Sequence, residues 1–249
     1  MNAERLCVKI LPTRDEMGKC AAAEVASCLR RLQDSRDEIN MIFAAAPSQN
    51  EMLASLIRQP DIRWDKINAF HMDEYIGLPP DAPQSFGRYL REHIFDCVPF
   101  RAVYYIRRGD ETAAQTVSRY TALLTEHPVD IVCLGIGENG HVAFNDPPVA
   151  DFRDTAVLKQ VQLDPICRMQ QVHDGCFAAL DDVPRSALTL TVPALCRASY
   201  MFCTVPGASK AQAVYDTIHH AVNERVPATV LRTHPHAVLY CDADSANLL

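Results

Sequence analysis

The sequence predicts an α/β fold: a single doubly wound, mainly parallel sheet with helices on both faces, in a Rossmann-like arrangement. Three observations support this prediction. Apolar, strand-like runs alternate with segments of helical spacing almost throughout the chain, which is typical of βαβ units. The run at residues 131–134 is apolar at every position, as in a parallel strand buried on both faces. The 249 residues contain no internal repeat and no linker-like tract, so we expect one domain over residues 1–249.

Local patterns predict the individual elements in chain order. Strand-like runs occur at residues 6–11, 39–46, 65–72, 103–106, 131–134, 155–163, 186–192, 200–205 and 237–241. Apolar residues spaced for one helix face occupy residues 14–32, 85–95, 111–126 and 209–220. A short helix is expected at residues 226–231. Another is expected after Pro47, because Ser48 and Glu51 have the spacing of a capping box.

Composition and charge limit the classes of partner. Apolar residues make up 48% of the chain and charged residues 22%, which are ordinary proportions for a globular protein. The formal net charge is −7 and no basic run occurs, so we expect no nucleic-acid partner. No apolar stretch is long enough to span a bilayer and no signal-peptide core follows the N-terminus, so we expect no membrane partner. An anionic substrate must then be held by a few placed cations.

The cysteines indicate a reducing compartment. Ten are scattered along the chain without a Cys-x-x-Cys pair or a zinc-binding spacing, and several lie within apolar runs. Buried, reduced thiols of this kind predict a cytoplasmic protein. No group of histidines and cysteines predicts a metal site.

The stretch from Asp130 to Pro148 carries the strongest functional signal. Its apolar run ends in a turn with three glycines, which can adopt positive φ and let a ligand approach the backbone closely. His141, Asn145 and Asp146 follow within a few residues. Polar groups gathered where a parallel strand ends are typical of ligand sites in open α/β sheets. The sequence therefore predicts a ligand site here.

Two motifs resemble the glucosamine-6-phosphate deaminase (isomerase) family. They are Gly135-Ile-Gly-Glu-Asn-Gly-His-Val-Ala-Phe-Asn-Asp-Pro147 and Phe70-His-Met-Asp-Glu-Tyr-Ile-Gly77. Weaker similarity includes Val205-Pro-Gly-Ala-Ser-Lys210 and runs to the end of the chain. The wider superfamily also contains 6-phosphogluconolactonases. The resemblance implies isomerisation and deamination of an amino-sugar phosphate, most simply glucosamine 6-phosphate to fructose 6-phosphate and ammonia. It implies that the ligand is a small sugar phosphate and that the reaction needs no cofactor. It does not decide whether the protein forms a homo-oligomer.

Four residues match the family's acid–base positions. The resemblance implies that Asp73 moves a proton between C1 and C2 of the opened sugar. Because neighbouring residues of an extended segment point to opposite faces, only one of Asp73 and Glu74 can face a pocket. His141 can open the pyranose ring, since imidazole titrates near neutrality. Asp146 stands where the family has a glutamate that orients this histidine, and Asn139 stands where the family often has an aspartate.

A phosphate group would need its own contacts. Lys210 matches the family's phosphate-binding lysine, and Arg168 is the arginine that the resemblance suggests. The family's early loop is rich in glycine and threonine, whereas this chain has Ala44-Ala-Ala-Pro-Ser-Gln-Asn50. Ser48 and Gln49 could still bind phosphate at a helix N-terminus, although the same pattern fits an ordinary capped helix.

Two other functions remain open at this point. A lactonase acting on a sugar-acid phosphate would need His141 to assist attack by water, and Asp73 would matter less. A sugar-phosphate sensor would bind without catalysis. Sensors of this superfamily usually carry an N-terminal helix-turn-helix domain, and the residues before the strand at residue 39 are too few for a separate module.

Overall fold

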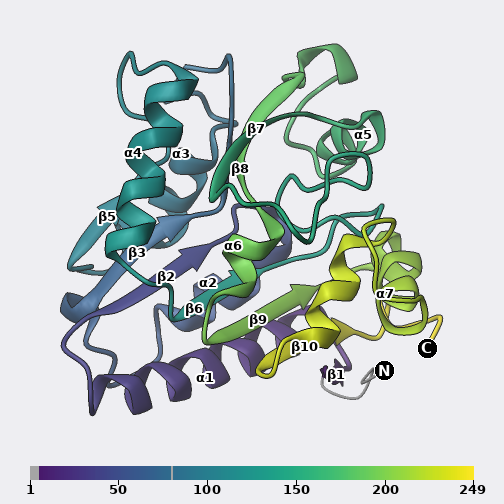
Figure 1. Cartoon of the computed structure of the whole chain (residues 1–249). Helices are drawn as coiled ribbons and strands as arrows, with labels where there is room; N and C mark the ends of the chain where they lie inside the picture. Colours follow the sequence, from purple (N-terminus) through teal and green to yellow (C-terminus); the bar gives the residue numbers. More distant parts are fainter. Residues whose placement is uncertain (1–5, 80) are drawn as a thin grey trace.

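The computed structural model describes residues 6–79 and 81–249 of the chain. Its main sheet has seven parallel strands in the order β1-β10-β9-β6-β2-β3-β5 (Figure 1). Their bounds are Cys7–Leu11 (β1), Ala237–Asp242 (β10), Tyr200–Val205 (β9), Ile131–Leu134 (β6), Ile39–Phe43 (β2), Ile67–His71 (β3) and Ala102–Tyr104 (β5). The predicted α/β fold with a mainly parallel sheet is thereby confirmed.

Helices cover both faces of this sheet. One face packs against α1 (Arg14–Gln33), α2 (Asn50–Leu56), α3 (Phe86–Leu90) and the π-helical turn Arg91–Phe95. The other face packs against α4 (Ala113–Glu126), α6 (Val192–Cys196) and α7 (Ala211–His219). On β2, Met41 and Phe43 face the first layer and Ile42 faces the second, because side chains alternate along a strand.

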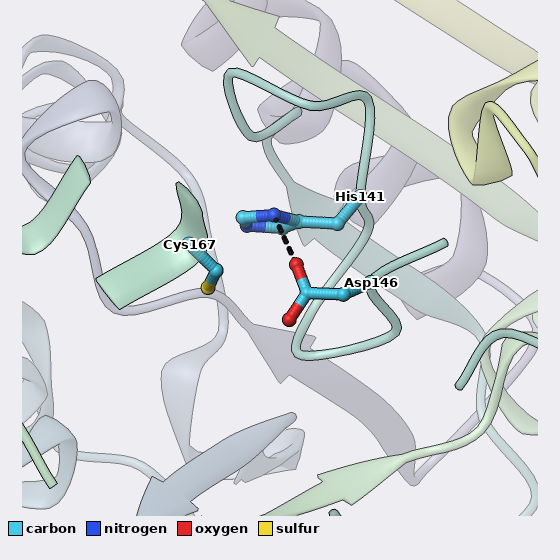
Figure 2. A group of neighbouring side chains, drawn as sticks. All are labelled: His141, Asp146 and Cys167. Atoms are coloured by element: carbon cyan, nitrogen blue, oxygen red, sulfur yellow. Dashed lines mark ion pairs between the residues drawn. The ribbon is translucent and has the colours of Figure 1, made fainter. Parts of the chain in front are cut away.

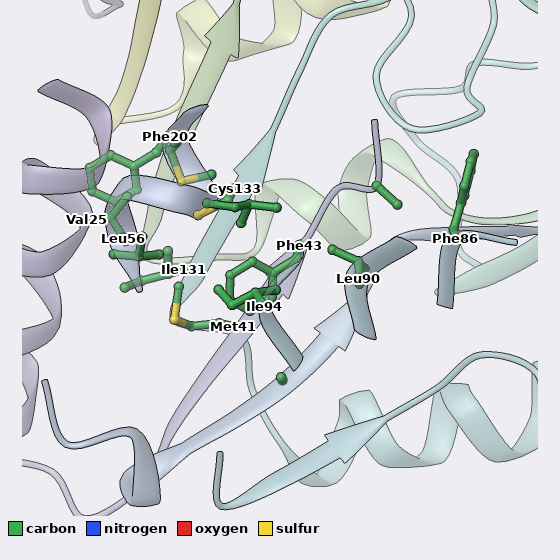
Figure 3. Packing of buried hydrophobic residues seen from close by; sticks show 14 of the residues in the cluster. Val25, Met41, Phe43, Leu56, Phe86, Leu90, Ile94, Ile131, Cys133 and Phe202 are labelled. Carbon is green, nitrogen blue, oxygen red and sulfur yellow. The ribbon is translucent and has the colours of Figure 1, made fainter. Parts of the chain in front are cut away.

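The first layer is a dense apolar core. Figure 3 shows Val25 of α1 and Leu56 of α2 against side chains of three central strands, Phe43, Ile131 and Phe202. Each fully buried aliphatic or aromatic side chain of this size contributes roughly 1.5–3 kcal/mol relative to an exposed one. The core therefore fixes the strand ends to which the functional loops are attached.

A second, small sheet was not foreseen. It is antiparallel, in the order β4-β8-β7, with bounds Asp73–Tyr75 (β4), Ser186–Leu190 (β8) and Leu158–Gln162 (β7). The sequence predicted strands at residues 155–163 and 186–192 but placed them in the main sheet. The predicted strand at 65–72 also differs, because β3 begins after the 3-10 turn Trp64–Lys66 and ends at His71. Asp73 therefore opens a separate strand.

The predicted capping box at Ser48 is wrong. A 3-10 turn, Pro47–Gln49, precedes α2, and neither element begins with a side-chain capping hydrogen bond. Glu51 instead forms an ion pair with Arg14, with 2.7 Å between carboxylate oxygen and guanidinium nitrogen. Of the short helix predicted at residues 226–231, residues 227–231 lie within a 3-10 helix, Pro227–Thr233, which Val226 precedes. The sequence also gave no prediction for α5, Pro165–His173, although Asp164 caps its N-terminus and Pro165 occupies its first position.

A buried histidine joins the two sheets. His71 Nδ1 lies 2.9 Å from the carbonyl oxygen of Asp73, and the backbone N–H of Ile106 donates to His71 Nε2 at 2.9 Å. These contacts require a neutral ring with the proton on Nδ1. Burial lowers the pKa of His71 to about 4.

This histidine should make the fold sensitive to acid. Because the unfolded chain binds a proton near pH 6.5 and the folded chain does not until about pH 4, stability should fall as the pH drops through this range. The expected loss attributable to His71 is about 3 kcal/mol. His71→Gln should flatten this part of the profile, as measured by chemical denaturation of both proteins from pH 7.5 to pH 4. A decline of equal size in the variant would contradict the assignment.

Candidate active site

A group of convergent polar residues lies at the carboxyl ends of β2 and β6. Strand order reverses here, since β3 and β5 follow β2 on one side while β9 and β10 follow β6 on the other. Such a switch point opens a crevice in doubly wound sheets. The crevice holds a cavity of about 180 Å³, and its walls include Ser48, Asp73, His141 and Lys210. The sheet thus brings together residues from four distant parts of the chain.

His141 is held by two polar neighbours. Its Nδ1 lies 2.7 Å from the side-chain oxygen of Asn139 and 2.9 Å from Oδ1 of Asp146 (Figure 2). Because both neighbours accept a hydrogen bond, Nδ1 carries a proton and Nε2 of the neutral ring has a free lone pair. The side chain lines the cavity while remaining 8% exposed. This arrangement can accept and return a proton at Nε2.

The two departures from the family pattern fit each other. Asp146 is one methylene shorter than glutamate, yet its carboxylate reaches the imidazole. The side-chain nitrogen of Asn139 donates to Asp146 Oδ1 at 3.0 Å, whereas an aspartate at position 139 would place a like charge there. Burial raises the pKa of Asp146, but hydrogen bonds from His141 and Asn139 outweigh it and leave that pKa lowered. The carboxylate is therefore charged at neutral pH.

Gly137 makes room for the imidazole. A Cβ at this position would lie 2.0 Å from His141 Cε1 and 2.3 Å from both ring nitrogens. Gly137→Ala should therefore displace the ring from Asn139 and Asp146 while leaving the core intact. We expect turnover to fall by about 10²-fold or more, the scale of a misplaced acid–base group. Steady-state kinetics and the thermal midpoint check this, and unchanged turnover would show that the ring position is unimportant.

Asp73 is a buried carboxyl group at the cavity wall. It is 6% exposed, and among the described residues no hydrogen bond to its side chain is seen. Burial, with the nearby charge of Glu74, raises its pKa well above the usual range. Glu74 points the other way and accepts backbone N–H bonds from Tyr75, Phe86 and Gly87. Of the two adjacent acids, Asp73 is the one that can act as a base in the cavity.

The small antiparallel sheet aligns Asp73 with the histidine loop. Thr189 of β8 pairs with Asp73 of β4, and its hydroxyl oxygen accepts the backbone N–H of Phe144 at 3.0 Å. Asn145 adds hydrogen bonds from its side chain to the carbonyls of Val142 and Leu190. One strand, β8, thus contacts both the strand that carries Asp73 and the loop that carries His141.

Only two of the four residues expected to bind phosphate line the cavity. Ser48 and Lys210 line the cavity, and Lys210 is 5% exposed, with burial lowering its pKa. Gln49 lies behind the wall, where its side-chain nitrogen donates to the carbonyl of Leu134 at 3.2 Å. Arg168 does not reach the cavity, because its guanidinium donates to the carbonyls of Leu180 and Val183.

Several cavity residues were missed by the sequence patterns. Arg14 comes from the start of α1, and Gln170, Gln171 and Asp174 come from α5 and the residue after it. The signal for α5 was present in Asp164-Pro165, the N-cap and first helical position. Nothing in the local sequence marks Arg14, since only the packing of α1 on α2 brings it to the cavity.

The structure also gathers a set of atoms with metal-ligand chemistry. Figure 2 shows Cys167 of α5 beside His141 and Asp146, and one potential ligand atom from each lies within 4.8 Å of the others. A nitrogen, a carboxylate oxygen and a thiol sulfur would suit Zn²⁺. The spacing of residues along the chain did not predict this set. The Nδ1 atom of His141 is already paired with the carboxylate of Asp146.

Fold and site together define the class of α/β proteins that carry acid–base groups at the switch point of a parallel sheet. Within this class, the chain belongs to the family described as glucosamine-6-phosphate isomerases/6-phosphogluconolactonase, whose model matches residues 12–240. The resemblance indicated by the two motifs is thereby confirmed.

Individual relatives agree with this assignment. The chain is 32% identical over 195 residues to a glucosamine-6-phosphate deaminase from Streptococcus pneumoniae, covering 78% of this chain and 81% of the relative. A glucosamine-6-phosphate deaminase from Streptococcus sanguinis is 31% identical over 205 residues, covering 82% and 85%. The fold matches that of a monomeric glucosamine-6-phosphate deaminase, with TM-score 0.87, 24% identity and coverage of 98% and 100%. A 6-phosphogluconolactonase from Shewanella baltica gives TM-score 0.78 at 18% identity, covering 98% and 100%.

Proposed function

We propose that the protein is an isomerising amino-sugar phosphate deaminase, with glucosamine 6-phosphate as its simplest substrate. One observation carries the proposal: the carboxyl group of Asp73 and the oriented imidazole of His141 face the same cavity. A proton shuttle and a separate base are what ring opening followed by proton transfer at carbon requires. Relatives that are 31–32% identical and carry the deaminase name support the same activity.

Ring opening is the first step of the proposed reaction. Nε2 of His141 takes the proton of the C1 hydroxyl and delivers a proton to O5 as the C1–O5 bond breaks, which leaves an aldehyde at C1. The imidazolium that forms in between is stabilised by the Asp146 carboxylate 2.9 Å from Nδ1. Asn139 holds that carboxylate in place through its side-chain nitrogen. The imidazole thus ends the step in the form in which it began.

Proton transfer at carbon follows. Asp73 removes the proton from C2, whose acidity the C1 aldehyde increases, while O1 takes a proton from solvent, and an enolamine forms. The same carboxyl group returns its proton to C1, giving a protonated imine at C2. Water adds to the protonated imine, and ammonia leaves as ammonium to give the ketose phosphate. The raised pKa of Asp73 suits this role, because a carboxylate with a higher pKa is a stronger base toward the C2 proton.

The assay that tests this function measures ammonia and ketose release from a panel of amino-sugar phosphates. We expect release from glucosamine 6-phosphate and lower or no release from its C4 epimer or from unphosphorylated glucosamine. Hydrolysis of 6-phosphogluconolactone is assayed in parallel, because the family also contains lactonases. Lactone hydrolysis without ammonia release would contradict the proposed deaminase activity and indicate a lactonase. Binding of sugar phosphates without either product would indicate a sensor.

Three further properties belong to this proposal. The chain acts as one domain over residues 1–249, supported by a single main sheet with core packing on both faces. It works in the cytoplasm, supported by ten cysteines that are all free thiols. None of the described helices combines the length and apolar content needed to cross a membrane. A homo-oligomer stays a prediction, and sedimentation of the purified protein tests it.

A further inference from the structure

The cavity contains a cation that neither motif includes. Arg14, the first residue of α1, lines the cavity together with Ser48 and Lys210. Its Nη2 donates to the carbonyl of Pro47, and its Nε lies 2.7 Å from the carboxylate of Glu51. The side chain is nevertheless 40% exposed. The guanidinium is thus held by Pro47 and Glu51, while part of the side chain remains exposed.

Close helix packing places Arg14 at this position. α1 and α2 approach so closely at Gly18 that a Cβ there would lie 2.4 Å from Cβ of Glu51. Thr13 caps α1 and sets the direction in which the helix starts. Any larger residue at position 18 would push α1, and with it Arg14, away from the turn after β2. The contact therefore determines where the guanidinium lies.

Arg14 and Lys210 flank the same turn. Arg14 contacts the carbonyl of Pro47, next to Ser48. On the other side, the hydroxyl of Thr204 near the end of β9 lies 3.5 Å from the carbonyl of Ser48, and β9 leads directly to Lys210. Asp73 and His141 belong to other strand ends. The two cations and the Ser48 hydroxyl thus line the cavity from the start of α1, the turn after β2 and the segment after β9, whereas the acid–base groups come from other segments.

We infer that Arg14 is the second cation of the substrate's phosphate site, in the role that the sequence assigned to Arg168. This inference rests on the proposed function for its ligand, a phosphate monoester at C6 of the sugar. Arg168 is held by two carbonyls outside the cavity, so among the described lysines and arginines only Lys210 would otherwise line the cavity and face a dianion. Guanidinium offers five N–H donors in a planar fork, and Pro47 and Glu51 use only part of them.

Glu51 orients the guanidinium of Arg14 and does not prevent it from binding an anion. The carboxylate of Glu51 beside Nε reduces the number of side-chain conformations that phosphate binding must freeze. Lys210 likewise has acidic neighbours, since burial lowers its pKa and the charges of Asp174 and Glu138 oppose that shift. Both side chains are thus placed before the phosphate arrives.

Calorimetric titration with inorganic phosphate tests the inference directly. Arg14→Gln should weaken phosphate binding by roughly 10- to 100-fold, the range for one lost charge-assisted hydrogen-bonding group. Arg14→Lys should restore part of the affinity, because it returns the charge without the planar fork. With glucosamine 6-phosphate, Arg14→Gln should raise KM and leave kcat nearly unchanged. Arg63→Gln is the matched control, since Arg63 is also paired with a carboxylate but is exposed and distant from the cavity.

The outcomes separate this inference from the proposed function. Equal phosphate affinity in wild type and Arg14→Gln overturns the role of Arg14, whatever the ammonia assay gives. Weaker phosphate binding in Arg14→Gln supports it even if no ammonia is released, in which case the proposed activity fails alone. A fall in kcat at unchanged KM also overturns it, because that pattern belongs to the acid–base groups. Thermal midpoints of all variants show whether each has folded.

Discussion

Asp73→Asn should abolish deamination and at the same time raise the thermal stability of the protein at neutral pH. An amide cannot accept the C2 proton, so ammonia release should fall by at least 10²–10⁴-fold, the usual contribution of a general base. The fold should persist, because the Asp73 side chain has no hydrogen bond to lose among the described residues. Ammonia release and thermal midpoint, measured on the same preparation, check both halves of the prediction.

The sign of the stability effect follows from the raised pKa of Asp73. Since the folded protein keeps this proton to a higher pH than the unfolded chain, ionisation opposes folding as the pH rises above about 4. Removing the carboxyl removes this cost, so the gain in thermal midpoint should be present at pH 8 and disappear near pH 4. Asp37→Asn, at a fully exposed carboxylate, is the matched control and should show neither effect. A stability gain independent of pH would contradict the assignment.

His141→Gln should impair the closed sugar much more than an open one. Glutamine can neither shuttle a proton at neutral pH nor replace the imidazole beside Asp146. Turnover of glucosamine 6-phosphate, which is mainly a pyranose, should fall by about 10²–10⁴-fold. The 4,5-dideoxy analogue lacks both O4 and O5 and forms neither the five-membered nor the six-membered ring, so its turnover should fall far less. Ammonia release from both substrates is the measurement.

Two controls sharpen the histidine prediction. His219→Gln removes an exposed histidine of α7 and should leave both substrates unaffected. Asp146→Asn keeps the hydrogen-bonding shape but removes the charge that stabilises the imidazolium, so it should resemble His141→Gln in a milder form. Equal losses on the closed and open substrates would remove ring opening from the role of His141.

Much of the fold could be predicted because its elements have strong local signals. The strand Ile131–Leu134 is apolar at every position and ends in glycines, and the predicted and observed bounds coincide. The helix Arg14–Gln33 is 20 residues long, and its buried residues are spaced along one face. What local patterns could not show was pairing. Residues 186–190 pair antiparallel with Asp73–Tyr75, a strand of three residues, and on their other side with residues 158–162, so both pairings are long-range or depend on a very short strand.

The site residues likewise differ in whether local sequence patterns could identify them. Asp73, His141, Asn139 and Asp146 occur in motifs whose spacing can be recognised along the chain. The choice between Asp73 and Glu74 needed the structure. Side chains alternate along a strand, so the two acids must point to opposite faces, but the sequence does not show which of them faces the cavity. Arg14 could not be found at all, since it is separated from Ser48 by a strand and most of a helix and reaches it only through the close approach at Gly18.

Transfer of the C2 hydrogen tests the central claim most directly. Glucosamine 6-phosphate carrying deuterium at C2 is incubated with wild type and with Asp73→Asn, and mass spectrometry follows the label in substrate and product. We expect wild type to release ammonia and to move deuterium from C2 to C1 or to water, while Asp73→Asn leaves it on C2. Wild type that releases no ammonia, or an Asp73→Asn variant that loses deuterium from C2 at the wild-type rate, would contradict the account.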